Sequence, residues 1–354
     1  ARDAGYDVIV VAPNSGCGHK IQALGFEYHS LSNARKRSGL IPLLTNLIEL
    51  VLVYRNLRPD IIHNSSIVMC TLGTVASFVV PRAAVINGFT GLGFLFSDPL
   101  RGQSITFRAA SWFLGFALRR PNIWPLFQNE DDYRDLAKVG LCRQRPNFIE
   151  GSGVDTGKFQ PLDRVPNSEP FVIGCAARLL RDKGFDILLE AMRLVGKENQ
   201  NIELRIVGSI DESNPSSYAQ SEVERWSQME NVEILGWQDD MVGFWQHCDV
   251  AILLSVREGL PKALIEACSC GLPIIASNVP GCRMIVRHEE NGFLVPYDNA
   301  EITAEAIIRM EADISFRMRA RAASRRHIFE GGFSERSIRD KYKQLLENIS
   351  LSTN

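Results

Sequence analysis

The chain has 354 residues, which is long enough for two domains of ordinary size with separate hydrophobic cores. Its hydrophobic fraction of 45% is typical of a soluble globular protein, and the absence of an uncharged apolar run of 18 residues excludes a transmembrane helix. The net charge of -2 conceals an asymmetry, because residues 1–165 carry 18 Lys and Arg against 13 Asp and Glu, whereas the remainder carries 21 against 28. A basic first half favours an anionic partner, either a phosphorylated ligand or a membrane surface.

The eight cysteines indicate neither a disulfide framework nor a metal site. They are scattered through mostly apolar segments, with no CxxC pair and no cluster of histidines beside them. Reduced, buried thiols in a cytoplasmic protein fit this distribution best, and no bound metal is expected.

Short apolar strands alternate with helical stretches along the whole chain. The opening residues, Ala-Arg-Asp-Ala-Gly-Tyr, resemble the end of a helix entering a strand, so we expect that the first strand of this domain is missing from the chain. In the first half the predicted strands are 7–13, 26–31, 61–65, 83–87, 124–129 and 147–149. In the second half they are 171–177, 202–208, 232–235, 250–255, 273–277 and 293–295.

This alternation predicts two doubly wound α/β domains, each with a parallel sheet covered by helices. The polar, proline-containing stretch 160–170 is the expected linker. The predicted domains are residues 1–165 and 166–333, and a final helix over 334–354 is expected to pack back towards the first. A ligand is expected at the carboxyl ends of the strands, in a cleft between the domains.

A basic loop follows the predicted strand 171–177. Arg178 and Lys183 at the mouth of such a strand can converge on a diphosphate, Arg as a fork and Lys as a point charge. A basic pair in a loop is more often simply solvated, so this pattern alone leaves both interpretations open.

An acidic loop with a helix after it follows the strand 250–255. Glu258, Gly259 and Leu260 precede Pro261, which suits the start of a helix because proline has no N–H to leave unpaired. The free amides and positive dipole end of that helix attract phosphate. Glu266 lies further along the helix, where it can reach a sugar hydroxyl. A carboxylate beside a phosphate site suggests a nucleotide-sugar site, whereas spacing alone favours a structural role.

Taken together, these stretches resemble the retaining glycosyltransferases of family four, which have the GT-B fold of two Rossmann-like domains. The resemblance covers nearly the whole chain and is carried by GSGVDTGKF at 151–159, AARLLRDKG at 176–184, CDVAILLSVREGLPKALIEA at 248–267 and VPGCRMIVRHEENGFLVP at 279–296. INGFTGLGFLF at 86–96 is similar to the bacterial branch that builds capsule, O-antigen and related cell-surface polysaccharides.

The resemblance implies a role for each matching residue. Arg178 and Lys183 match positions that neutralise the donor diphosphate, and Glu266 matches the acid that binds the donor ribose. Glu258 matches the catalytic acid at the transferred sugar, and the amides of Gly259 and Leu260 lie where the helix N-terminus meets phosphate. Such enzymes generally need no metal or other cofactor and retain the anomeric configuration.

The first domain departs from the family pattern. Many members carry a histidine in the loop that aligns with Thr90 and Gly91, so these two residues are candidates for the acceptor side without an assigned base. Met284 stands where related sequences often have Glu. We also expect that the strand that begins the family's first domain, with its glycine-rich loop, is missing from this chain.

The leading hypothesis is a hexosyltransferase that moves a sugar from a nucleotide diphosphate donor, expected to be a UDP-sugar, to a lipid-diphosphate-linked saccharide. The alternatives are a UDP-sugar 2-epimerase and a non-catalytic nucleotide-sugar binder. A dehydrogenase is disfavoured because no GxGxxG follows an early strand, and no nucleic acid partner is expected.

Two apolar segments raise the hypothesis of a peripheral position at the inner face of the plasma membrane. Residues 105–120 combine aromatic and aliphatic side chains with terminal arginines, and residues 40–53 follow the basic triplet Arg35-Lys36-Arg37. Such segments suit a protein that rests on anionic lipid. They are equally compatible with core helices that have solvated basic ends.

Overall fold

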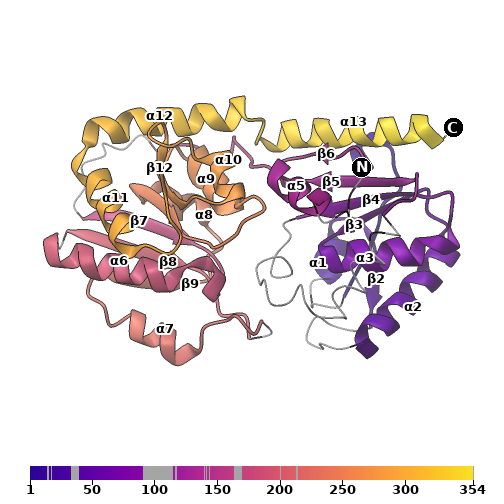
Figure 1. Cartoon of the computed structure of the whole chain (residues 1–354), viewed down its shortest axis with the longest axis horizontal. Helices are drawn as coiled ribbons and strands as arrows, with labels where there is room; N and C mark the ends of the chain where they lie inside the picture. Colours follow the sequence, from indigo (N-terminus) through magenta and orange to yellow (C-terminus); the bar gives the residue numbers. More distant parts are fainter. Residues whose placement is uncertain are drawn as a thin grey trace. The chain divides into compact units, whose positions relative to one another are not determined.

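The computed structural model describes residues 1–13, 16, 18–32, 40–90, 115, 118–138, 140, 142, 144–162, 170–199, 201–212 and 214–353. The chain forms two compact units, one of residues 1–149 with 339–354 and one of residues 150–338 (Figure 1). The boundary therefore lies earlier than the expected one after residue 165, and the first unit also contains most of the last helix.

The first unit is built from parallel strands and the helices between them. Its elements are η1 (Arg2–Ala4), β1 (Ile9–Pro13), α1 (Gly18–Ala23), β2 (Glu27–Leu31), α2 (Leu40–Leu57), β3 (Ile61–Ser65), α3 (Ile67–Ala76), η2 (Ser77–Val79), β4 (Ala84–Phe89), β5 (Ile123–Phe127), α5 (Glu130–Lys138), β6 (Asn147–Phe148) and α13 (Glu335–Thr353). The strands form two sheets, of order β1-β2 and β3-β4-β5-β6.

Both sheets of the first unit contribute to one hydrophobic core. Leu31 of β2 and Phe127 of β5 are buried in the same cluster, and Val11 of β1 packs against it. Leu50 and Tyr54 contribute the inner face of α2. The two sheets are thus held together by side chains, although no described strand pairs with both.

The second unit has one parallel six-stranded sheet. Its elements are β7 (Phe171–Ala176), η5 (Arg181–Lys183), α6 (Phe185–Glu198), β8 (Ile202–Val207), α7 (Gln220–Trp226), β9 (Val232–Gly236), α8 (Met241–Gln246), β10 (Val250–Leu253), α9 (Lys262–Ser269), β11 (Ile274–Ser277), α10 (Pro280–Ile285), β12 (Gly292–Val295), α11 (Ala300–Ala312) and α12 (Ile314–Glu330). The order is β12-β11-β10-β7-β8-β9, so the winding direction reverses between β7 and β10. Doubly wound folds bind ligands at the carboxyl ends of the strands on either side of such a switch point.

Helices cover both faces of this sheet, as the alternating sequence predicts (Figure 1). One hydrophobic cluster contains Phe185 and Met192 of α6 with Ile307 of α11. The other contains Trp245 of α8 with Leu264 of α9. Burial on both faces explains why the strands are continuous apolar runs rather than alternating ones.

Long-range contacts explain why residues 150–162 belong to the second unit. Val154 forms an isolated parallel bridge with Ser334. The guanidinium of Arg325 on α12 donates to the carbonyls of Thr156 and Phe159, at 2.9 and 2.7 Å. A long-range clamp of this kind leaves no local signal in the sequence.

No helix within the described part of the chain is both long and apolar enough to cross a membrane. Of the two apolar segments singled out in the sequence, residues 40–53 lie within α2. Residues 105–114 lie outside the described residues.

Candidate functional site in the second unit

Three loops at the carboxyl ends of β7, β10 and β11 form the candidate site. The loop after β7 carries Arg178 and Lys183, and the loop after β10 carries Glu258. Since β7 and β10 are neighbours on the two sides of the switch point, residues far apart in sequence arrive at one place.

Glycines allow these loops to pack closely. Gly184 has φ 74°, and a Cβ on it would collide with the carbonyl of Leu254. A Cβ on Gly281 in α10 would collide with the carbonyls of Glu258 and Gly259. Larger residues at either glycine would push the loops apart, so both glycines set the geometry of the site.

Lys183 and Glu258 form the central ion pair of the site. Lys183 Nζ lies 2.6 Å from Glu258 Oε1, and the two side chains are only 16% and 13% exposed. The hydroxyl of Ser255 donates to the same carboxylate oxygen at 2.6 Å. A cation and a hydroxyl thus hold Glu258 by one oxygen, which fixes the direction of its carboxylate.

Arg178 follows the end of β7, but its ion-pair partner is a different acid from Glu258. Its Nη1 contacts Asp211 Oδ2 at 3.2 Å, in the loop after β8, and its side chain is 56% exposed. An exposed pair of this kind contributes little to stability, so Arg178 can exchange Asp211 for an anionic ligand at small cost.

The N-terminus of α9 lies directly after the loop that carries Glu258. Pro261 is the N-cap in extended conformation, and α9 begins at Lys262. Gly259 is buried and Leu260 partly buried just before it. The amide of Gly281 donates to the carbonyl of Glu258 at 3.2 Å, which fastens the α10 loop to this turn. The first N–H groups of a helix have no partner within the helix, so an anion at this end of α9 would meet backbone donors.

Glu266 lies one turn into α9 and is nearly buried. Burial raises the pKa of its carboxyl, and the ammonium of Lys262, 3.6 Å from Oε1, opposes that rise. A buried carboxylate with an exposed lysine as its ion-pair partner is suited to accept hydrogen bonds from ligand hydroxyls.

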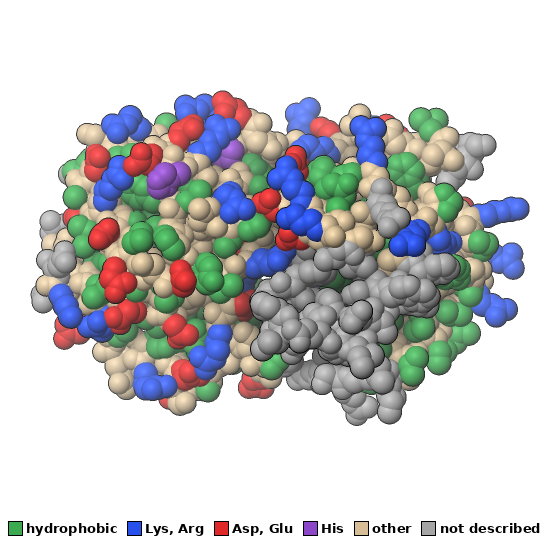
Figure 2. Space-filling model, viewed as in Figure 1, with side chains coloured by type: hydrophobic (Ala, Val, Ile, Leu, Met, Phe, Trp, Pro, Cys, Tyr) green, Lys and Arg blue, Asp and Glu red, His purple; other side chains and the backbone are tan. Residues whose placement is uncertain are grey.

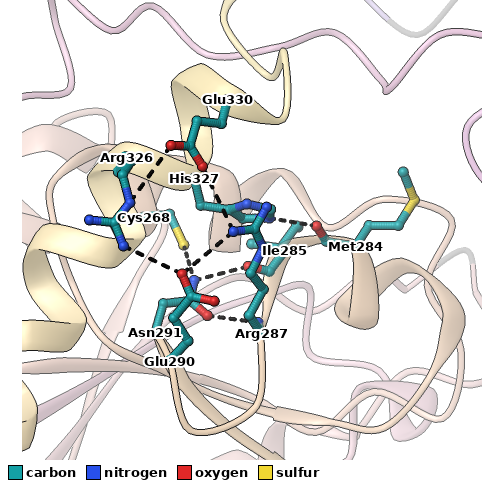
Figure 3. A network of polar contacts seen from close by, with 9 residues as sticks. All are labelled: Cys268, Met284, Ile285, Arg287, Glu290, Asn291, Arg326, His327 and Glu330. Atoms are coloured by element: carbon teal, nitrogen blue, oxygen red, sulfur yellow. Dashed lines mark hydrogen bonds and ion pairs between the residues drawn. The ribbon is translucent and has the colours of Figure 1, made fainter.

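The loop between α10 and β12 is tied to α12 by a polar network (Figure 3). His327 Nε2 lies 2.8 Å from the carbonyl of Met284, and Asn291 Nδ2 donates to the carbonyl of Ile285 at 3.0 Å. Glu290 pairs with Arg287 and Arg326. Met284 therefore contributes through its backbone carbonyl, and the network holds the end of α10 and the loop that follows it against α12.

The two acceptor-side candidates belong to the first unit. Thr90 is exposed and directly follows β4, whereas Gly91 lies outside the described residues.

Sequence reasoning missed Ser255 and Asp211, and it included Gly281 in a family motif without assigning it a packing role. Ser255 looks like the last residue of a buried strand, and Asp211 lies in a polar loop without a motif. Only a search for hydroxyls within a few residues of a functional acid would have singled out Ser255. Within the described residues, no group of three or more His, Cys, Asp or Glu side chains is arranged to hold a metal ion.

Residues 159–327 match the sequence model of the family described as glycosyl transferases group 1. This region contains every donor-side candidate, from Arg178 to Glu266. The chain is also similar over nearly its whole length to curated bacterial glycosyltransferases.

One such relative is the capsular polysaccharide biosynthesis glycosyltransferase CapM of Staphylococcus aureus, 23% identical over 97% of this chain and 90% of the relative. A second is the N,N'-diacetylbacillosaminyl-diphospho-undecaprenol alpha-1,3-N-acetylgalactosaminyltransferase of Campylobacter jejuni, 25% identical over 98% and 93%. A third is the UDP-Gal:alpha-D-GlcNAc-diphosphoundecaprenol alpha-1,3-galactosyltransferase of Escherichia coli, 27% identical over 78% and 72%.

Solved structures share the fold. Anabaena HepE in complex with UDP superposes with a TM-score of 0.78 at 16% identity, covering 98% of this chain and 93% of HepE. Sucrose-phosphate synthase of Thermosynechococcus elongatus gives 0.76 at 18% identity, covering 92% and 84%.

Proposed function

Because residues 159–327 match the sequence model of the group 1 glycosyl transferases and the chain has the GT-B fold, we propose that this protein is a glycosyltransferase with a specific transfer reaction. It moves a hexosyl group from a UDP-sugar to a lipid-diphosphate-linked saccharide during the synthesis of a cell-surface polysaccharide. It works in the cytoplasm, at the inner face of the plasma membrane, and retains the anomeric configuration without a metal.

The Lys183–Glu258 ion pair at the switch point is the observation that supports the proposed donor site. A diphosphate at the carboxyl ends of β7 and β10 offers Lys183 a doubly charged partner, and Arg178 and the N-terminus of α9 add further positive potential. These groups supply the charge neutralisation that a metal ion supplies in other transferases. The UDP bound to HepE and the UDP-Gal in the name of the Escherichia coli relative support uridine as the nucleoside of the donor.

The diphosphoundecaprenol in the names of two relatives supports the acceptor class. In the proposed step, the bond from the anomeric carbon to the donor diphosphate breaks, and the acceptor hydroxyl oxygen forms its bond to that carbon on the same face. The acceptor proton passes to the departing diphosphate, so UDP leaves as the second product. Glu258 stands at the transferred sugar, where its carboxylate orients hydroxyls and stabilises positive charge on the ring.

A transfer assay tests the function. The protein is incubated with a panel of UDP-sugars and with undecaprenyl-diphosphate-linked mono- and disaccharides, and lipid products and free UDP are measured together. The proposal predicts equal amounts of extended lipid and UDP for one donor, with an α-linked product from an α-linked donor.

The same assay separates the alternative activities. Conversion of the UDP-sugar into an epimer without lipid extension would show an isomerase. Tight UDP-sugar binding with no product from any donor and acceptor would show a non-catalytic binder.

A further inference from the structure

The outer face of α2 in the first unit exposes an unusual row of large apolar side chains. Leu44, Ile48 and Leu52 are 57%, 59% and 60% exposed, and their spacing of four residues puts them on one side of the helix. The opposite side, with Leu50 and Tyr54, is buried in the core. An amphipathic helix normally presents polar and charged residues to water. The exposed apolar row departs from that pattern, and α2 is therefore apolar on two sides.

Charged side chains around this row are mostly basic. Within residues 42–57 of α2 the charged residues are Glu49 and Arg55, and Glu49 Oε2 is engaged by the amide of Ser32 at 2.8 Å. Arg55 and Arg58 are exposed where α2 ends.

The neighbouring turn η2 also exposes an apolar side chain with basic residues close by. It packs beside α2 and exposes Phe78, whose ring lies 4.5 Å from the guanidinium carbon of Arg120. Arg82, just after η2, is exposed as well. Hydrophobic and basic side chains gather at the right-hand end of Figure 2, where α2 lies in Figure 1, and acidic ones are few there.

We propose that the row Leu44, Ile48 and Leu52, with Arg55 and Arg58 at its end, docks α2 onto an anionic lipid bilayer. Apolar side chains enter the boundary of the acyl chains while arginines meet lipid phosphates. A second copy of this chain fits less well, because two such faces would bring their arginines together. The inference deepens the proposed function, since an enzyme with a lipid-linked acceptor must reach that acceptor at a bilayer.

Vesicle flotation tests the proposal with the full chain and without donor or acceptor, so its result does not depend on transfer activity. Wild-type protein should float with vesicles of phosphatidylglycerol and phosphatidylcholine and far less with phosphatidylcholine alone. The triple variant Leu44→Ser, Ile48→Ser, Leu52→Ser should bind the anionic vesicles at least about tenfold more weakly, because three partly exposed aliphatic side chains no longer enter the lipid.

A matched control uses exposed apolar residues of the second unit. Ile302→Ser, Ile314→Ser, Met318→Ser removes a similar set of side chains from α11 and α12 and should leave vesicle binding unchanged. Arg55→Glu, Arg58→Glu should abolish the preference for anionic lipid. Circular dichroism and UDP binding of each variant establish that it is folded.

Three outcomes overturn the proposal. The first is that wild-type protein does not bind anionic vesicles. Equal loss of binding in the α2 and control triples is the second. The third is a wild-type dimer by light scattering that the α2 triple converts to monomers with vesicle binding intact, which would assign the row to self-association.

Discussion

Glu258 is oriented by two neighbours, and their contributions to the proposed catalysis can be separated. When a donor diphosphate draws the ammonium of Lys183, the Ser255 hydroxyl remains as the group that holds Glu258 Oε1. Ser255 is therefore a positioning residue for this carboxylate.

Ser255→Ala should lower kcat about tenfold, since a hydrogen bond to a charged group contributes on the order of 1.5–3 kcal/mol. The Kd for UDP should stay within about twofold, because the diphosphate contacts are intact. In a Glu258→Gln background the same change should have little further effect, since the two residues act as a unit.

Ser277→Ala is the matched control for this prediction. Ser277 is equally buried, and its hydroxyl binds the backbone carbonyl of Ser255 rather than Glu258. It should lower Tm and leave kcat nearly unchanged. If Ser255→Ala lowers Tm and UDP affinity as well as kcat, Ser255 only supports the loop.

Glu266 illustrates a conflict between stability and binding. Its pKa is raised by burial, so the folded chain holds this proton to a higher pH than the unfolded chain does. The contribution of Glu266 to stability therefore falls as pH rises from below the ordinary glutamate pKa of about 4.3 through the folded value.

Glu266→Gln should accordingly raise Tm at pH 7, and the gain should shrink towards pH 4. UDP affinity should fall roughly tenfold or more, because a neutral amide accepts weaker hydrogen bonds from hydroxyls than a carboxylate does. Thermal scans across pH and UDP titrations measure the two effects. Unchanged UDP affinity would remove the ribose role from Glu266.

At the scale of elements, the contact between α12 and the end of α10 depends on a neutral histidine. Burial lowers the pKa of His327, and its Nδ1 has no hydrogen-bond partner among the described residues. The unfolded chain binds the proton more readily, so the folded chain loses stability as pH falls through the ordinary histidine value of about 6.5.

His327→Gln keeps a donor for the carbonyl of Met284 but does not titrate. Its Tm should therefore fall less between pH 7 and pH 5 than the Tm of the wild type, although it is somewhat lower at pH 7. Parallel Tm curves for the two proteins would show that His327 does not carry the acid sensitivity.

The strands could be predicted from the sequence because they are buried apolar runs bounded by glycine, proline and polar residues. The positions of β3, β7 and β10 follow from that pattern alone, and with them the loops that hold Lys183 and Glu258. The clamp of Arg325 on Phe159 spans 166 residues, so no local pattern places residues 150–162 in the second unit.

The ion-pair partners of the site residues could not be predicted from the sequence either. The sequence suggests that Arg178 and Lys183 face a common anion, but the pairing of one with Asp211 and the other with Glu258 depends on how three loops meet. The two sheets of the first unit raise the same difficulty, because no pattern in β1 or β3 indicates that separate sheets share a core.

For the whole molecule, the proposed reaction needs no divalent cation. Exhaustive treatment with EDTA should leave the rate of sugar transfer unchanged, and added Mg²⁺ or Mn²⁺ should not raise it more than about twofold, since side chains and a helix end neutralise the diphosphate. The rate is measured with and without chelator at constant ionic strength. Loss of activity with EDTA and recovery with Mn²⁺ would contradict metal independence.

The assignment of the donor diphosphate to Lys183 is the central claim, and calorimetric titration with UDP and UMP tests it most directly. Wild-type protein should bind UDP more tightly than UMP, because only the second phosphate reaches the ammonium. Lys183→Met should weaken UDP binding about 10- to 100-fold, which corresponds to roughly 1.5–3 kcal/mol for a hydrogen bond to a charged group, and change UMP binding little. Equal affinity of wild type and Lys183→Met for UDP would contradict the account.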